Sequence, residues 1–146
     1  MLFVLVLSVI SVASSAPASA SGTCTWPVIG PVIRGFDPPG SPYEAGHRGI
    51  DIAAPDATLV RAPAAGVVTF AGEKTGYGTL VEVSHGNGLV TRYGHNSGLA
   101  VTVGRTVQRG DTLAYIGSTG RSTGPHVHFE VLKNGRQVDP LTFIGR

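Results

Sequence analysis

The sequence predicts a single all-β domain made of short strands and tight turns. With 146 residues, the chain has room for one core of ordinary size and no second large one. It holds 21 glycines and 10 prolines, which favour turns over long helices. Its apolar runs are short, rich in Val, Ile, Thr and aromatic residues, and bounded by turn formers. No segment has sustained helical periodicity.

The first twenty residues read as a secretory signal rather than as part of the domain. An apolar run covers Met1 to Ile10, and small residues follow it up to Ala18-Ser19-Ala20. The run is too short to span a bilayer, and we expect cleavage after Ala20. An uncleaved anchor is the alternative reading, because no Lys or Arg precedes the run. The prediction is a secreted or extracytoplasmic domain over 21–146, with no stable membrane span once the signal is cut.

The remaining elements follow in chain order. Residues 21–49 are rich in Gly and Pro, which predicts a loop with one or two short extended pieces. Each later apolar run predicts a strand. These runs are 49–54, 58–62, 66–72, 78–85, 88–95, 112–118 and 126–135. The stretches "HGNG" at 85–88 and "KNGR" at 133–136 predict hairpin turns, because Asn-Gly tolerates positive φ.

Charge and cysteine content exclude several classes of protein. The net charge of +2 and the isoelectric point near 9.0 come from basic residues spread along the chain, without a basic run. This gives no footprint for nucleic-acid binding, although weak attraction to an anionic cell surface is compatible with it. Cys24 is the only cysteine, so the chain forms no internal disulfide. We expect a monomer.

The five histidines carry the chemical signal. His126 and His128 are two positions apart on a predicted strand, so their side chains point to the same face about 6–7 Å apart at the backbone. That spacing lets both bind one metal ion, or lets one bind while the other reaches a metal-bound water. His47 and Asp51 would lie about 13 Å apart on a straight strand, too far for one ion. A bend at Gly49 would bring them together.

These residue types suit zinc. Imidazole and carboxylate are ordinary Zn²⁺ ligands, and a catalytic zinc keeps three protein ligands and one open position. Two histidines and one aspartate meet that count, and a further histidine near the water can take its proton or stabilise an oxyanion. Each motif alone is weak, because His-x-His and His-x-x-x-Asp both occur by chance. The spacing therefore leaves a metal site and a set of scattered histidines both open.

Several motifs together resemble a known family. "GHRGID", "AAGVVTFAG", "HGNG", "YGH" and "GSTGRSTGPHVHFE" are similar to the lysostaphin-type zinc metallopeptidases, and the likeness covers about residues 26–140. The resemblance implies a small antiparallel β-sheet domain with a groove, the duplicated hybrid motif fold. It also implies a secreted zinc endopeptidase that cuts the peptides of bacterial peptidoglycan.

The resemblance also implies roles for single residues. His47, Asp51 and His128 would bind one zinc ion, and His95 and His126 would be the catalytic histidines. His85 matches a turn position and receives no catalytic role. Tyr43, upstream of His47, would be a candidate to help hold the oxyanion. The alternative function is a non-catalytic wall protein that binds peptidoglycan or activates a separate amidase, and the complete set of ligands argues against it.

Overall fold

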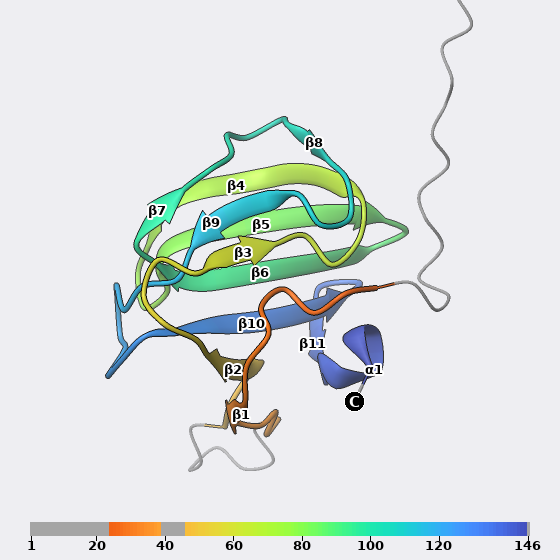
Figure 1. Cartoon of the computed structure of the whole chain (residues 1–146). Coiled ribbons are helices and arrows are strands. Elements are labelled where there is room, and N and C mark those ends of the chain that lie inside the picture. Colours follow the sequence, from red (N-terminus) through yellow and green to blue (C-terminus); the bar gives the residue numbers. More distant parts are fainter. Residues whose placement is uncertain (1–23, 39–45, 146) are drawn as a thin grey trace, which may run out of the picture.

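The computed structural model describes residues 24–38 and 46–145 (Figure 1). Its strands are β1 (Val32–Arg34), β2 (Ile50–Ala53), β3 (Leu59–Arg61), β4 (Gly66–Lys74), β5 (Gly78–Gly86), β6 (Leu89–Asn96), β7 (Gly98–Leu99), β8 (Thr106–Val107), β9 (Thr112–Tyr115), β10 (His126–Lys133) and β11 (Arg136–Val138). All their pairings are antiparallel. The all-β prediction is therefore confirmed.

The strands divide between two sheets, a division that the sequence did not indicate. Within the described residues the large sheet has the order β1-β2-β10-β6-β5-β4-β8, with β11 paired to β10, and the small sheet has the order β3-β9-β7. Figure 1 shows β3 and β9 lying over β5 and β6 of the large sheet. The core fills the space between the sheets, since one cluster of buried side chains includes Val60 and Leu113 from the small sheet and Val81 and Phe129 from the large one.

Alternation along the strands decides what the large sheet presents on each face. On β10 the odd positions Val127, Phe129 and Val131 are buried in the core cluster. The even positions from 126 to 130 are His, His and Glu, and they lie on the opposite face. On β2, Ile50 and Ile52 are likewise in the core, and Asp51 lies on the face with the histidines. One face of the sheet is therefore hydrophobic, and the other face holds the histidine and carboxylate side chains.

Both predicted hairpin turns are confirmed. Asn87 and Gly88 join β5 to β6 with φ of 52° and 77°, and Asn134 and Gly135 join β10 to β11 with φ of 52° and 80°. Two consecutive positive φ values match the right-handed twist of the flanking strands. The described part of the Gly/Pro-rich segment contains one strand, β1. The short β7, β8 and β11 were not predicted, because two or three residues give no readable alternation.

The ends of the fold are short elements. Within the described residues the single helix is α1 (Leu141–Ile144), one turn that follows Pro140 and ends at Gly145. The sequence analysis did not predict it, because one turn is too short to show periodicity.

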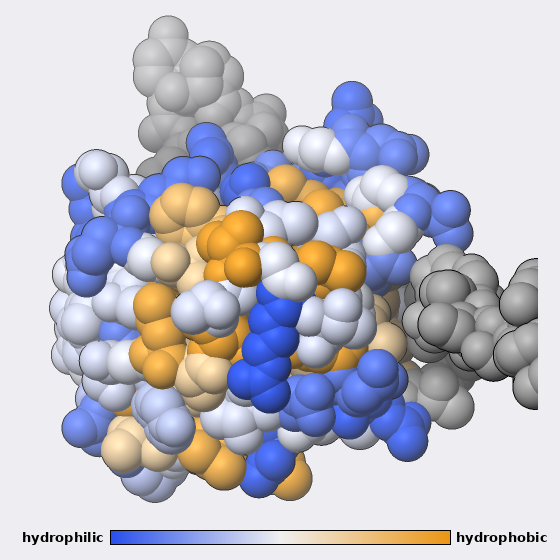
Figure 2. Space-filling model, turned by 90° about the horizontal axis from the view of Figure 1, so that it is seen from above, coloured by the Kyte–Doolittle hydropathy of each residue, from blue (hydrophilic) through white to orange (hydrophobic). Residues whose placement is uncertain are grey.

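The sheet edge at β8 is only two residues long, which limits pairing with other chains. Figure 2 shows the face on this side, where apolar side chains form small patches separated by polar ones.

In the part of the chain that the structure describes, no helix has the length and apolar character needed to cross a membrane. The predicted signal at 1–20 lies outside the described residues, as does Tyr43.

Candidate metal centre and active site

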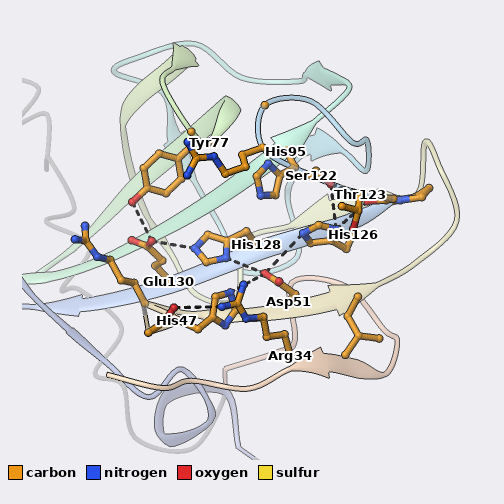
Figure 3. A pocket seen from close by; sticks show the side chains of 18 residues that line it. Arg34, His47, Asp51, Tyr77, His95, Ser122, Thr123, His126, His128 and Glu130 are labelled. Carbon is orange, nitrogen blue, oxygen red and sulfur yellow. Dashed lines mark hydrogen bonds and ion pairs between the residues drawn. The ribbon is translucent and has the colours of Figure 1, made fainter. Parts of the chain in front are cut away.

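The site is assembled on the polar face of three neighbouring strands. His128 on β10 stands opposite Asp51 on β2, and on its other side it stands opposite Gly94 on β6. His126 and Glu130 flank His128 along β10. Figure 3 shows the side chains of His47, Asp51, His95, His126 and His128 converging in one groove. The groove has a volume of about 1030 Å³, and all five of these side chains line it.

His47 and Asp51 come together because the chain bends at Gly49, as the sequence predicted. Backbone bonds join His47 to Asp37, and the chain turns at Arg48–Gly49 before entering β2. The bend presses Gly49 onto β10: a Cβ there would lie 2.2 Å from the carbonyl oxygen of Phe129. Only glycine allows this approach. The result is a distance of 3.2 Å between His47 Nε2 and Asp51 Oδ1.

Three donor atoms of the site fit a small divalent ion. His128 Nδ1 lies 2.8 Å from Asp51 Oδ1, and one ligand atom from each of His47, Asp51 and His128 lies within 4.8 Å of the others. Ligands about 2.0 Å from a tetrahedral zinc are about 3.3 Å apart along the edges of the tetrahedron. The His47–Asp51 distance of 3.2 Å matches that value, and the His128–Asp51 distance of 2.8 Å is shorter, as in a hydrogen bond. The donor set, two imidazoles and one carboxylate, is the chemistry that zinc prefers.

Each imidazole has one nitrogen fixed away from the centre. His47 Nδ1–H donates to the carbonyl oxygen of Gly35 at 2.8 Å, which leaves Nε2 for a metal. His128 is turned the other way, with Nε2 against Glu130 at 2.9 Å and Nδ1 toward Asp51. A partner on the outer nitrogen fixes the tautomer and the ring orientation of a metal-binding histidine.

Electrostatics at the centre favours the charged forms of His128 and Asp51. Burial alone would lower the pKa of His128, but its hydrogen bonds to the Asp51 and Glu130 carboxylates raise it to about 9. Burial alone would raise the pKa of Asp51, but the hydrogen bond from His128 and the nearby imidazoles hold it below its ordinary value. Without an ion, a proton on His128 therefore offsets the negative charge of Asp51.

His95 and His126 form the second half of the site. Their ring centroids are 4.9 Å apart, and His126 Nε2 lies 3.7 Å from Asp51 Oδ1. His95 donates Nδ1–H to the carbonyl oxygen of Thr119 at 2.7 Å, and His126 donates Nδ1–H to that of Gly124 at 2.8 Å. In the neutral form of each ring, Nε2 is then the nitrogen with the lone pair. Burial lowers the pKa of His95, which keeps that ring neutral near pH 7.

His95 sits in a backbone bulge. Between Thr79 and Val81 β5 advances two residues, whereas the facing stretch of β6 advances three, from Tyr93 to Asn96. Within this bulge His95 adopts a left-handed backbone conformation with φ of +66°. This conformation costs a residue with a side chain about 1–3 kcal/mol. The buried Asn96 amide holds the bulge by donating to the carbonyl oxygens of Thr79 and Tyr93 at 2.9 and 2.8 Å. The bulge turns the imidazole of His95 into the groove.

His85, which received no catalytic role, lies away from this groove. It is buried, donates Nδ1–H to the carbonyl oxygen of Ala65 at 2.7 Å, and accepts at Nε2 from the Thr91 hydroxyl at 2.8 Å. The Thr91 hydroxyl in turn contacts that of Tyr93 at 2.6 Å. These bonds occupy both ring nitrogens inside the sheet.

Sequence reasoning missed three residues beside the histidines. Glu130 is 1% exposed and contacts His128 and Tyr77 (Figure 3). Arg92 contacts Glu130 as well. One signal could have found Glu130: in "HVHFE" the alternation that puts His126 and His128 on one face puts Glu130 there too. Tyr77 has no such signal, because it lies in the turn between β4 and β5. The described residues therefore bring Tyr77 to the site, and Tyr43 lies outside them.

A comparison with protein-family models decides the family. The model of peptidase family M23 matches residues 45–140, a stretch that contains all five convergent side chains. The chain belongs to peptidase family M23. The likeness to lysostaphin-type enzymes is confirmed by the catalytic domain of lysostaphin from Staphylococcus simulans. That structure is 31% identical with a TM-score of 0.68, over 77% of this chain and 90% of that one.

The names of other similar proteins include both peptidases and an activator of murein hydrolases. A zinc-containing peptidase from Vibrio cholerae is 33% identical with a TM-score of 0.75, over 81% of this chain and 39% of that one. The DD-carboxypeptidase/endopeptidase Mpg of Neisseria meningitidis is 50% identical over 66% of this chain and 22% of that protein. The murein hydrolase activator EnvC of Escherichia coli is 36% identical over 86% and 30%. The chain thus spans less than a third of these two curated relatives.

Proposed function

We propose that this M23 domain is a zinc-dependent endopeptidase that acts outside the cytoplasm and hydrolyses peptide bonds in bacterial peptidoglycan. One observation carries the proposal. Four imidazoles in one groove each have one ring nitrogen bound to an outer acceptor, and three of them place the other nitrogen within 3.7 Å of Asp51 Oδ1. The fourth, His95, packs beside His126 with ring centroids 4.9 Å apart. A structural role alone would not require four histidines to converge in this way.

His47 Nε2, an Asp51 oxygen and His128 Nδ1 would hold the ion, as their spacing suits. Zinc in that position supplies a Lewis acid that polarises the scissile carbonyl and lowers the pKa of a bound water to about 7. His95 and His126 line the same groove beside these three residues.

The two remaining histidines would move the proton. Because both donate Nδ1–H to backbone carbonyls, each has a lone pair on Nε2 that can accept a proton from the attacking water. The imidazolium formed in this way has an Nε2–H that can stabilise the developing oxyanion or pass the proton to the leaving amine. One water is consumed, one peptide bond breaks, and the imidazole returns to its starting form.

Similarity to Mpg supports peptidoglycan peptides as the substrate, and similarity to EnvC supports a competing candidate. In that candidate the domain activates a separate amidase and does not itself hydrolyse. The complete set of two histidines and one aspartate within 4.8 Å, with His95 and His126 beside it, favours the hydrolase.

The test is digestion of purified sacculi by the zinc-loaded protein with no other protein present. The proposal expects new amino groups, loss of their release with a chelator, and recovery when zinc is added back. A protein that releases none on its own, but increases the rate of a purified amidase, would be an activator instead.

A further inference from the structure

Glu130 is a buried carboxylate with no role in the proposed hydrolysis. It is 1% exposed and lies on β10 two residues beyond His128, on the same face of the sheet. Taking a carboxylate out of water is costly unless hydrogen bonds and opposite charge compensate it. The partners of Glu130 therefore show what the burial achieves.

Both oxygens of Glu130 are occupied. Oε1 accepts from the Tyr77 hydroxyl and from His128 Nε2, each at 2.9 Å. Oε2 lies 3.4 Å from Arg92 Nη1. A guanidinium can only donate, and the Tyr77 hydroxyl donates to Oε1, so Glu130 faces a donor at each oxygen. The Glu130 carboxylate is therefore the acceptor in these contacts.

Strand register holds Glu130 in place. Across three neighbouring strands, Glu82 on β5 stands opposite Arg92 on β6, and Arg92 stands opposite Glu130 on β10. Arg92 Nε lies 2.7 Å from Glu82 Oε2, so one guanidinium bridges both carboxylates. Tyr77 reaches Glu130 over Gly94, where an added Cβ would lie 3.4 Å from the tyrosine ring. Glu130 thus has fixed neighbours on the side away from the metal centre.

This arrangement constrains His128 from both sides. Asp51 lies 2.8 Å from Nδ1, and Glu130 lies 2.9 Å from Nε2 (Figure 3). Because Glu130 accepts, Nε2 of His128 carries a proton and donates a hydrogen bond to it. When the ring binds a metal, Nδ1 is then the nitrogen that gives up its proton and supplies the lone pair. A ring flip would break the bond to Glu130.

We propose that Glu130 is a positioning residue that fixes the tautomer and orientation of His128 so that Nδ1 binds the metal. This inference rests on the proposed zinc site and deepens it. Partners of this kind change metal affinity by about 10–100-fold in other metalloproteins. Tyr77 and Arg92 act through Glu130 by holding its carboxylate in place.

Glu82 supplies the matched control. It pairs with the same arginine at the other end of the row, but no contact joins it to His128. Glu82→Gln therefore perturbs the ion pairs of the sheet without touching the metal ligand. If Glu130 served only the sheet, Glu130→Gln and Glu82→Gln would have the same effect.

The experiment measures zinc Kd by competition with a chromophoric chelator for the purified wild type, Glu82→Gln, Glu130→Gln and Glu130→Ala. Glu130→Ala should weaken zinc binding about 10–100-fold, and Glu130→Gln, which keeps an acceptor, should fall between it and the wild type. Glu82→Gln should stay within about 2-fold. If Glu130→Ala does not fold, Glu130→Gln decides: a change below about 2-fold overturns the proposal.

A second readout follows the proton itself. Nitrogen NMR of the zinc-loaded protein should show a slowly exchanging His128 Nε2–H in the wild type and in Glu82→Gln, and rapid exchange in Glu130→Ala. Equal loss of affinity or of this proton in Glu82→Gln would overturn the proposal. Zinc affinities in the expected order without hydrolysis of sacculi would overturn only the endopeptidase. Hydrolysis with unchanged affinities would overturn only the role of Glu130, and a wild type that binds no zinc would overturn both.

Discussion

His95 and His126 face each other with ring centroids 4.9 Å apart, and both donate Nδ1–H to carbonyl oxygens of the loop before β10. Residues far apart in the sequence thus share one tautomer, set by one loop. Thr119 provides one of the two carbonyls, and its N–H donates back to the carbonyl of His95 at 3.3 Å. The loop therefore fixes which ring nitrogen of each histidine donates to the backbone.

Thr119→Ala should lower activity without changing zinc affinity. The Thr119 hydroxyl donates to the carbonyl oxygen of Asn96 at 2.6 Å and accepts from the N–H of Thr79 at 3.1 Å, so its loss loosens the carbonyl that orients His95. We expect about 10-fold lower kcat/KM on a peptidoglycan peptide and a stability loss of about 1–2 kcal/mol. Thr58→Ala, whose hydroxyl bonds only locally to Pro55, is the control. A zinc Kd that changes with kcat/KM would contradict this account.

Gly49→Ala should weaken zinc binding and destabilise the fold together. The new Cβ would lie 2.2 Å from the carbonyl oxygen of Phe129, so the bend must move away from β10 and take His47 with it. We expect a loss of at least about 2 kcal/mol in unfolding free energy, together with a higher zinc Kd. Gly72→Ala, where a Cβ would meet nothing within 4 Å, is the matched control. Denaturant unfolding and zinc competition check both, and equal behaviour of the two variants would refute the role of the bend.

Protonation of the buried His85 should lower the free energy of unfolding in mild acid. Burial lowers its pKa below the ordinary value of 6.5, so the unfolded chain binds more protons than the folded one in that range. Stability then rises with pH up to about 6.5 and falls as pH drops below it. The midpoint of urea unfolding should decrease between pH 7.5 and 5.5, and less so in His85→Gln. An identical pH dependence in the variant would count against this assignment.

Three exposed arginines line the groove, and one of them, Arg34, donates to the carbonyl oxygen of Gly46. The other two, Arg48 and Arg121, should favour peptides that carry a carboxylate, because the groove's own carboxylates are bound to histidines. Replacing either arginine with glutamine should raise KM for a peptide with a free carboxylate about 2–5-fold and leave an amidated analogue unchanged. The effect should shrink with added salt, since exposed charges are screened. Arg136→Gln, on β11, is the control, and equal effects on both peptides would disprove the preference.

The hairpin turns and the longer strands could be predicted from the sequence, and the arrangement of the strands in two sheets could not. Asn-Gly pairs and apolar alternation indicated the two hairpins and the longer strands, because they depend on neighbouring residues. The separation of β3, β7 and β9 into a second sheet depends on contacts such as Val60 with the distant core. No pattern within a strand as short as β7 or β8 records those contacts.

Some features of the site could likewise be predicted from the sequence, and others could not. The residue types and the bend at Gly49 were readable, because the distance problem between His47 and Asp51 allows few solutions. The strained φ of His95 and the approach of Tyr77 were not, since both depend on how β5 and β6 pair. The role of Glu130 depends on register across three strands, and a linear sequence does not display register.

The most direct test of the central claim separates metal binding from hydrolysis at one centre. Zinc content and release of amino groups from sacculi would be measured for the wild type, His126→Ala, His47→Ala and Asp51→Ala. The account predicts that His126→Ala keeps one zinc per chain and loses at least about 100-fold in activity, whereas the other two variants lose the metal. A wild type fully active without zinc, or a His126→Ala variant as active as the wild type, would contradict it.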